Sequence, residues 1–335
     1  MRIPLLFEPP SFPVQSGEKG RVFRMIFGGD IMTCGKGLVP RVAPKVREIL
    51  AGADLFIANC EGPVGPANKD EKGFPWINFG IEETFLSSFL EGLELSPSRC
   101  VLSVANNHMG DRALGGLQAT LVNLGRMGVR AAGQVEGGKP PLLVQEINGF
   151  RLGITAWTHW QNRRTFDERP AVLRARDVLG WDWQDIKRNL RIDCLIGVPH
   201  WGFEFQHFPR AEERRLAESL VKKGFDILAG HHPHVLQPLE WLGKNPCFYS
   251  LGNVNGPPLP FLSWPVRLGA FFEVNLVAEG ADRGRIAGFA VHPFFRRDVG
   301  GKEGLSLLEE APTRLRQKLQ DRINRLFPFL HSTVA

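Results

Sequence analysis

The sequence lacks three features that would each indicate a well-known class of protein: a Cys-x-x-Cys pair, an apolar segment of about 20 residues, and a run of basic residues. Its cysteines are odd in number, which argues against a disulfide framework as well as a zinc ribbon. The missing apolar segment argues against a membrane anchor, and the proline-interrupted start of the chain argues against a signal peptide. We therefore expect a cytoplasmic protein whose cysteines are mostly buried thiols, namely Cys34, Cys60, Cys100, Cys194 and Cys247.

The charge of the chain is basic but dispersed. Lysine and arginine number 41 and aspartate and glutamate 35, which gives a formal net charge of +6 and a pI near 9.2. A basic surface attracts polyanions. The basic residues occur in pairs along the chain, however, which favours solvated helix faces over a nucleic-acid surface. We expect an anionic small molecule or polymer as the partner, and no nucleic acid.

Short apolar runs alternate with amphipathic segments. The runs with strand character cover residues 21–30, 54–62, 99–108, 151–160, 193–202, 226–234 and 247–253. Several segments between them repeat apolar residues at helical spacing, so the alternation predicts an α/β fold. Residues 269–277 and 284–295 predict a hairpin of longer strands. A last helix over residues 312–327 is predicted to dock by one face, which carries Leu315, Leu319, Ile323 and Leu326.

Polar side chains collect where the predicted strands end. In α/β sheets, ligands bind outside the carboxyl ends of the strands, so we expect these side chains to converge at one edge. They are Asp30 after the first run, Asn59 and Glu61 after the second, Asn106, Asn107, His108 and Asp111 after the third, His200 and Glu204 after the fifth, and His231, His232 and His234 after the sixth.

This mixture of carboxylates, amides and imidazoles suits Mn, Fe or Zn better than Ca or Mg. It suffices for one or two divalent ions, and two ions sharing a carboxylate would generate hydroxide from water and stabilise an anionic transition state. His232 and His234 flank a proline, in a turn that would point both side chains the same way. Each residue also has an ordinary explanation: Asp30 as a turn residue, His200 as a core histidine, and the Asn-Asn-His stretch as turn chemistry. Their joint occurrence at strand ends favours a metal site.

The motifs in this order resemble those of the CapA family, the capsule or poly-γ-glutamate synthesis proteins. They are "FGGDIM", "ANCEGP", "SVANNHMGD", "VPHWGFE", "FDILAGHHPHVLQPLE" and "YSLGN", spread over residues 24–254. The resemblance implies a divergent calcineurin-like metallophosphoesterase domain. That domain is a four-layer αββα sandwich, with two mixed sheets flanked by helices. We expect it to cover residues 21–300, with a C-terminal helical segment, 301–335, docked on it.

The resemblance also implies a role for each polar residue. The first ion would be bound by Asp30 and His234, the second by Asn107, His200 and His232, and both by Glu61. His108 would be the general acid or an anion-binding group, oriented by Asp111. Four further residues are candidates for the site: Asn59, Asn106, His231 and Glu204, the last as an acceptor that supports His200.

Two positions depart from the phosphoesterase pattern. That pattern begins with Asp-x-His, whereas residue 32 is Met. Glu61 stands where the superfamily has an aspartate, which moves the carboxylate by about one bond length. Cys34 lies close in sequence, but a buried thiol is the favoured interpretation. The departures predict either one ion or two ions of unequal affinity.

Two functions are consistent with these residues. The first is a metal-dependent hydrolase acting on an anionic substrate, either a phosphoester or a γ-glutamyl amide, and linked by family to capsule synthesis. The second is a polyglutamate-binding accessory component that keeps the fold without turnover. The missing histidine at position 32 favours the second function, and the cluster at the strand ends favours the first.

Overall fold

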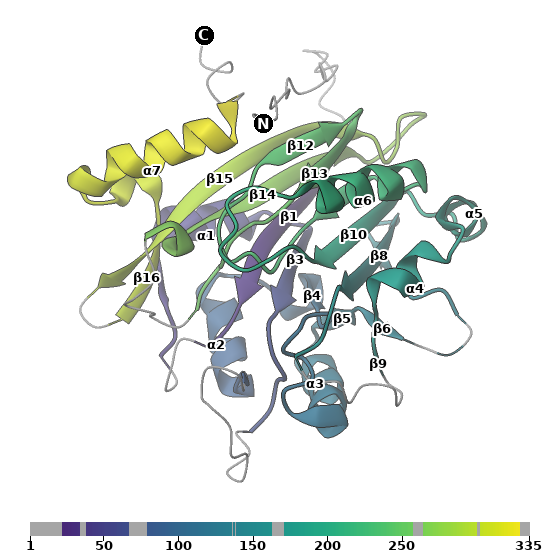
Figure 1. Cartoon of the computed structure of the whole chain (residues 1–335), viewed down its shortest axis with the longest axis horizontal. Helices are drawn as coiled ribbons and strands as arrows, with labels where there is room; N and C mark the ends of the chain where they lie inside the picture. Colours follow the sequence, from purple (N-terminus) through teal and green to yellow (C-terminus); the bar gives the residue numbers. More distant parts are fainter. Residues whose placement is uncertain are drawn as a thin grey trace.

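The computed structural model describes residues 22–33, 38–66, 79–135, 137, 139–162, 171–256, 264–299 and 302–328. Their strands form two large mixed sheets that pack face to face, and helices cover the outer face of each sheet (Figure 1). The four-layer αββα sandwich and the α/β class predicted from the sequence are confirmed.

The first sheet has eight strands, and its central strand β1 lies between parallel and antiparallel neighbours. Strands β1, β3, β4 and β5 run parallel, so their carboxyl ends lie at one edge. In sheet order the strands are β2 (Arg41–Val42), β16 (Lys302–Leu307), β15 (Ile286–Val299), β14 (Leu268–Val277), β1 (Val22–Ile31), β3 (Leu55–Cys60), β4 (Cys100–Ser103) and β5 (Arg130–Ala132).

The second sheet has six strands, four of which, β8, β10, β11 and β13, are parallel. In sheet order they are β12 (Leu239–Leu242), β13 (Asn245–Phe248), β11 (Ile227–Ala229), β10 (Cys194–His200), β8 (Phe150–Thr158) and β7 (Leu143–Ile147). A small antiparallel ribbon joins β6 (Gln134–Val135) to β9 (Ala171–Val172).

The helices form the two outer layers and a separate cover. Helices α1 (Pro44–Ala51), α2 (Glu83–Gly92) and α3 (Ala113–Arg126) lie against the first sheet, and α4 (Ala175–Leu179), α5 (Trp183–Asn189) and α6 (Ala211–Lys222) against the second (Figure 1). Helix α7 (Thr313–Leu326) buries Leu319, Ile323 and Leu326 in the main core, as the apolar face of its sequence requires. Short 3-10 helices cover Pro97–Arg99, Trp264–Arg267 and Leu308–Glu310.

The second sheet divides its side chains between two cores. In β10, Cys194, Ile196 and Val198 face the first sheet, whereas Leu195 belongs to a separate cluster on the helical side. This alternation follows from the two-residue period of a strand. Trp183 of α5 and Leu220 of α6 fill that outer cluster. The double-sided burial explains why these strands read as continuous apolar runs in the sequence.

Three predicted strands are too long. The run 99–108 is a strand only over Cys100–Ser103, the run 226–234 only over Ile227–Ala229, and the run 247–253 only at its start, because β13 ends at Phe248. In all three, the polar residues lie in the loop beyond the strand, where they are free to turn toward the site. The strands β2, β5, β6, β7, β9, β12 and β16 were not predicted.

The described cysteines, Cys60, Cys100, Cys194 and Cys247, are buried free thiols, as predicted. Burial raises the pKa of both Cys60 and Cys100 to about 12. Cys34 lies outside the described residues. Among the helices that the structure describes, none is both long enough and apolar enough to cross a bilayer.

An ion-pair network ties β1 to β14 and β15. Glu273 accepts hydrogen bonds from Arg24 at 2.8 Å, His292 at 2.9 Å and Asn275 at 3.0 Å. Burial alone would raise the pKa of this carboxyl, but these hydrogen bonds outweigh burial and hold the pKa well below its usual range.

Two glycines allow the backbone near the strand ends to pack closely. A Cβ on Gly29 would lie 1.9 Å from the carbonyl oxygen of Gly252, and one on Gly230 would lie 2.2 Å from that of Tyr249. No larger residue fits such contacts. The close approach lets Asp30 N–H donate to Gly252 O at 2.9 Å, which fixes the end of β1 against the segment after β13.

Candidate metal centre

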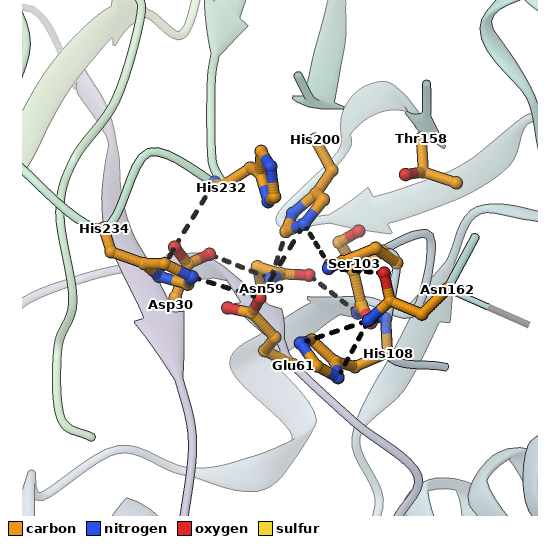
Figure 2. A network of polar contacts seen from close by, with 12 residues as sticks. Asp30, Asn59, Glu61, Ser103, His108, Thr158, Asn162, His200, His232 and His234 are labelled. Atoms are coloured by element: carbon orange, nitrogen blue, oxygen red, sulfur yellow. Dashed lines mark hydrogen bonds and ion pairs between the residues drawn. The ribbon is translucent and has the colours of Figure 1, made fainter. Parts of the chain in front are cut away.

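The polar residues predicted at the strand ends meet at one edge of the sandwich (Figure 2). Asp30 ends β1, Glu61 follows β3, and His108 follows β4, all in the first sheet. His200 ends β10, and the histidine-rich turn of residues 231–234 follows β11, both in the second sheet. The site therefore lies between the carboxyl ends of the parallel strands of both sheets.

One group of possible ligands consists of Asp30, Glu61 and His234, whose ligand atoms lie within 4.8 Å of one another. His234 Nδ1 lies 3.3 Å from Asp30 Oδ2, and His234 Nε2 lies 3.6 Å from Glu61 Oε1. Burial alone would lower the pKa of His234, but the charges of Glu61 and Asp30 outweigh burial and raise it to about 10. The two carboxylates thus favour a positive charge at this position.

A second group shares Glu61 and adds His200 and His232, again with ligand atoms within 4.8 Å. His200 Nε2 lies 3.8 Å from Glu61 Oε1 and 2.8 Å from Asn107 Oδ1, so the amide oxygen faces the same space. The rings of His200 and His232 have centroids 4.6 Å apart. Burial and the neighbouring His232 and His231 lower the pKa of His200 well below its usual value, which keeps it neutral, as a ligand must be.

Several buried polar atoms of these groups have no hydrogen-bond partner within the described residues. They are Oε1 and Oε2 of Glu61 and both ring nitrogens of His232, in side chains that are 0% and 1% exposed. Burial raises the pKa of Glu61 well above its usual value, and the nearby Asp30 adds to this. Burying such atoms unpaired is costly, and a divalent ion beside them would be bound by the Glu61 carboxylate and by one of the two His232 nitrogens. The donor set of oxygen and imidazole nitrogen fits Mn, Fe or Zn.

His108 and Asp111 form a pair beside these groups. His108 Nδ1 lies 2.7 Å from Asp111 Oδ2, which also accepts from Phe79 N–H at 2.8 Å. The Phe79 ring stacks on His108 with centroids 3.9 Å apart. Asn162 Nδ2 lies 3.4 Å from His108 Nδ1, and its Oδ1 accepts from Asn107 Nδ2. These contacts fix the plane of the imidazole.

Asn59 and Asn106 hold the ligands in place. Asn59 donates from Nδ2 to Asp30 Oδ1 at 2.8 Å and accepts from Asn106 Nδ2 at 3.1 Å. Asn106 also donates to Cys60 O at 2.7 Å and accepts from His108 N–H at 3.2 Å. The two amides therefore link the carboxylate end of β1 to the loop that carries His108.

His231, His232 and His234 have different surroundings, although they are neighbours in sequence. His231 Nε2 donates to Gly28 O at 3.0 Å, and the residue belongs to none of the groups described above. His232 and His234 have positive φ values of +97° and +56°, which turn both rings toward the site. This matches the predicted turn around the proline.

Glu204 is placed differently from its prediction. Its carboxylate lies within 4.8 Å of ligand atoms of His232 and His234 and forms a third group with them. The ring nitrogens of His200, which Glu204 was predicted to support, instead face Asn59, Asn107 and Glu61.

Sequence reasoning missed four residues that contact the site, among them Phe79 and Asn162, which lie beside His108. Asn253 Oδ1 accepts from His234 Nδ1 at 2.9 Å, and Trp160 packs edge-on against His232 with centroids 4.6 Å apart. Asn253 lies within the quoted motif "YSLGN", so a motif that was recognised already contained it. Met32 is 5% exposed and belongs to none of the three groups. Its N–H donates to Asn255 Oδ1 at 3.2 Å.

Known proteins resemble the chain over the same region. It matches the family described as "Bacterial capsule synthesis protein PGA_cap" over residues 24–256. The PGA biosynthesis protein CapA of Bacillus subtilis is 30% identical over 216 residues, 62% of this chain and 54% of that protein. The capsule biosynthesis protein CapA of Bacillus anthracis is 32% identical over 255 residues, 72% of this chain and 61% of that protein. The chain thus spans little more than half the length of these relatives.

Among solved structures, a 5′-nucleotidase precursor from Thermus thermophilus is 14% identical, with a TM-score of 0.44, covering 93% of this chain and 59% of that one. That likeness is too remote to support a conclusion. The family match spans all the strand-end motifs, from the one that carries Asp30 to the one that carries Asn253, and two relatives exceed or reach 30% identity. The chain belongs to the bacterial capsule synthesis protein family PGA_cap.

Proposed function

We propose that the chain is a metal-dependent hydrolase that acts on an anionic substrate. The observation that carries the proposal is the buried cluster around Glu61, in which the carboxylate oxygens and the nitrogens of His232 lack hydrogen-bond partners among the described residues. When bound, divalent Mn, Fe or Zn supplies Lewis acidity and lowers the pKa of water. The residues around the cluster would bind, orient and protonate the substrate.

In this proposal the protein holds two ions of unequal affinity. Asp30 and His234 hold the first, His200, His232 and the Asn107 amide hold the second, and Glu61 reaches both. The shared position of Glu61 in two groups supports this assignment. The second group has the larger number of neutral donors, since burial also lowers the pKa of His232 to about 3.

His108 is proposed as the general acid. Asp111 accepts from Nδ1, so Nε2 of His108, which lies 3.5 Å from Asn162 Nδ2, is the nitrogen left for a substrate, and the stacked Phe79 ring fixes the plane of the imidazole. The imidazolium would give its Nε2 proton to the leaving group, and Asp111 would stabilise the charged ring before the transfer. General acid catalysis of this kind contributes about 10²- to 10⁴-fold to the rate.

The substrate is proposed to be an acidic polymer or a phosphoester. Two relatives are named for PGA or capsule biosynthesis, and a third, 26% identical over 179 residues (48% of this chain and 45% of that protein), is named as a probable polyglutamine synthesis accessory protein in Mycobacterium tuberculosis. A net charge of +6 favours an anionic ligand. Hydrolysis of a γ-glutamyl amide and hydrolysis of a phosphoester both place negative charge on an oxygen next to the cluster, and the site chemistry serves both.

The proposal is tested on the purified full chain after removal and return of Mn²⁺ or Zn²⁺. Metal content is measured by mass spectrometry. Activity is measured with poly-γ-glutamate, by the appearance of new amino groups, and with a chromogenic phosphodiester. We expect metal-dependent turnover of one substrate, with a loss of at least 100-fold in His108→Ala. If no divalent ion binds, or if His108→Ala turns over substrate at the wild-type rate, the proposal is wrong.

A second candidate function is polymer binding without turnover, favoured by Met32 at the position of a usual ligand. In that case poly-γ-glutamate binds with an affinity that falls steeply with salt, and His108→Ala leaves both binding and any background rate unchanged. The cytoplasmic location and the absence of a nucleic-acid partner stay predictions, the latter testable by filter binding at physiological salt.

A further inference from the structure

The loop after β10 holds Glu204 against the histidine-rich turn. Trp201 N–H donates to His231 O at 3.1 Å, and Phe205 N–H donates to Pro233 O at 2.8 Å. These two hydrogen bonds stand on either side of Glu204 in the sequence. Phe205 has a φ of +63°, which is uncommon for a bulky residue and persists only when the surrounding structure enforces it. The position of Glu204 is therefore defined by the backbone.

The Glu204 carboxylate forms a third group of possible ligands with His232 and His234, and it lies on the solvent side of that group. One of its oxygens and one nitrogen each of His232 and His234 lie within 4.8 Å of one another. Ligand atoms about 2.0–2.2 Å from one ion lie at most about 4.4 Å apart, so a small side-chain movement would bring the Glu204 carboxylate into reach of an ion bound by His234. Glu204 is exposed, whereas both histidines are buried.

An independent observation indicates that a ligand is missing here. His232 is 1% exposed, and neither of its ring nitrogens has a partner within the described residues. The group of Asp30, Glu61 and His234 offers three side chains, which leaves a Zn or Mn ion with at least one open position for a further ligand. A carboxylate that reaches both His232 and His234 can complete this set without displacing a buried residue.

We propose that Glu204 is a metal ligand, which joins Asp30, Glu61 and His234 on the first ion, at the mouth of the site and next to His232. The inference rests on the proposed metal-dependent function and adds a ligand to it. Because Glu204 comes from an exposed loop and the other ligands from the buried strand ends, Glu204 sets how tightly the ion is held against release to solvent.

Glu204→Gln tests the proposal, because it keeps the size of the side chain and removes its charge. The matched control is Glu218→Gln, an exposed glutamate on α6 outside the three groups. Affinity for Mn²⁺ and Zn²⁺ is measured on the metal-free full chain by competition with a chromogenic chelator. We expect Glu204→Gln to weaken the binding of at least one ion by about tenfold or more, and Glu218→Gln to match the wild type.

The visible absorption spectrum of the Co²⁺-loaded protein separates a ligand from a distant charge. Loss of a ligand changes the spectrum, whereas loss of a distant charge lowers affinity and leaves the spectrum unchanged. A changed spectrum in Glu204→Gln supports the proposal. An unchanged spectrum, or an unchanged affinity, overturns it. A wild-type chain that binds no divalent ion refutes the proposed function instead. Urea unfolding of the metal-free variants, expected to match the wild type, shows that both fold.

Discussion

Replacing His232 by alanine separates the free-energy cost of burying this side chain from its proposed role in binding metal. In the metal-free protein two effects oppose each other. The variant loses the packing of a buried ring, about 1.5–3 kcal/mol, and no longer buries two nitrogens without partners, which relieves about 1–3 kcal/mol. Alanine keeps the same unfavourable positive φ of +97°. We therefore expect the free energy of unfolding to change by no more than about 1–2 kcal/mol.

The substitution should have a larger effect on the stabilisation that the protein gains when it binds metal. At a metal concentration of 100 times Kd, binding stabilises the wild type by about 2.7 kcal/mol. If the variant binds about 100-fold more weakly, the same concentration stabilises it by only about 0.4 kcal/mol. The difference of about 2.3 kcal/mol means that metal raises the Tm of the variant by roughly 3 °C less than it raises the Tm of the wild type, for a chain of this size.

The assay is thermal unfolding, followed by tryptophan fluorescence, with and without Mn²⁺ or Zn²⁺. His207→Ala is the control, because His207 is exposed and bonds to Arg322 outside the site. We expect it to keep the full increase in Tm. If His232→Ala shows the same increase in Tm as the wild type, the reasoning about its unpartnered nitrogens is refuted.

Three further predictions concern other parts of the molecule. His108→Ala should lower turnover by about 10²- to 10⁴-fold while metal affinity, measured by chelator competition, stays at the wild-type value; a parallel loss of affinity would contradict its role as an acid. Gly29→Ala should lower the free energy of unfolding in urea by more than about 2 kcal/mol, because its Cβ would lie 1.9 Å from Gly252 O, whereas Gly92→Ala, with nothing within 4 Å, should be nearly neutral. Glu273→Gln should lose about 1–2 kcal/mol of stability at pH 7. The pKa of Glu273 is lower in the folded protein than in the unfolded chain, so the extra stability of the wild type is fully present above the unfolded pKa of about 4.3 and is lost as the pH falls through the folded pKa. If the wild type and Glu273→Gln still differ as much in free energy of unfolding at pH 2 as at pH 7, the prediction is wrong.

The fold class was predictable from the sequence because the strands at the centre of the sheets are apolar. The runs 21–30 and 193–202 became β1 and β10 with ends shifted by one or two residues. In the runs 99–108 and 226–234 the strands end at Ser103 and Ala229, before the first polar residues of the site. Apolar composition alone does not mark that point. The division into a domain of residues 21–300 and a docked C-terminal segment stays a prediction.

The sequence predicted which residues form the candidate site, but it did not predict which of them contact one another. Strand-end position and residue type were enough to nominate Asp30, Glu61 and the histidines. The contacts that decide the role of each residue are tertiary. Glu204 faces His232 rather than His200 because the loop after β10 bonds to the turn after β11, which no local pattern reveals. Asn253 contacts His234 for the same reason, since the end of β1 pairs with the segment after β13.

The most direct test of the metal centre is anomalous diffraction from crystals of the full chain loaded with Mn²⁺ or Zn²⁺, collected on both sides of the absorption edge. We predict one anomalous peak between Asp30, Glu61 and His234 and a second, at the site of unequal affinity, between Glu61, His200 and His232. Crystals soaked to saturation that show no peak within coordinating distance of Glu61 would contradict the account.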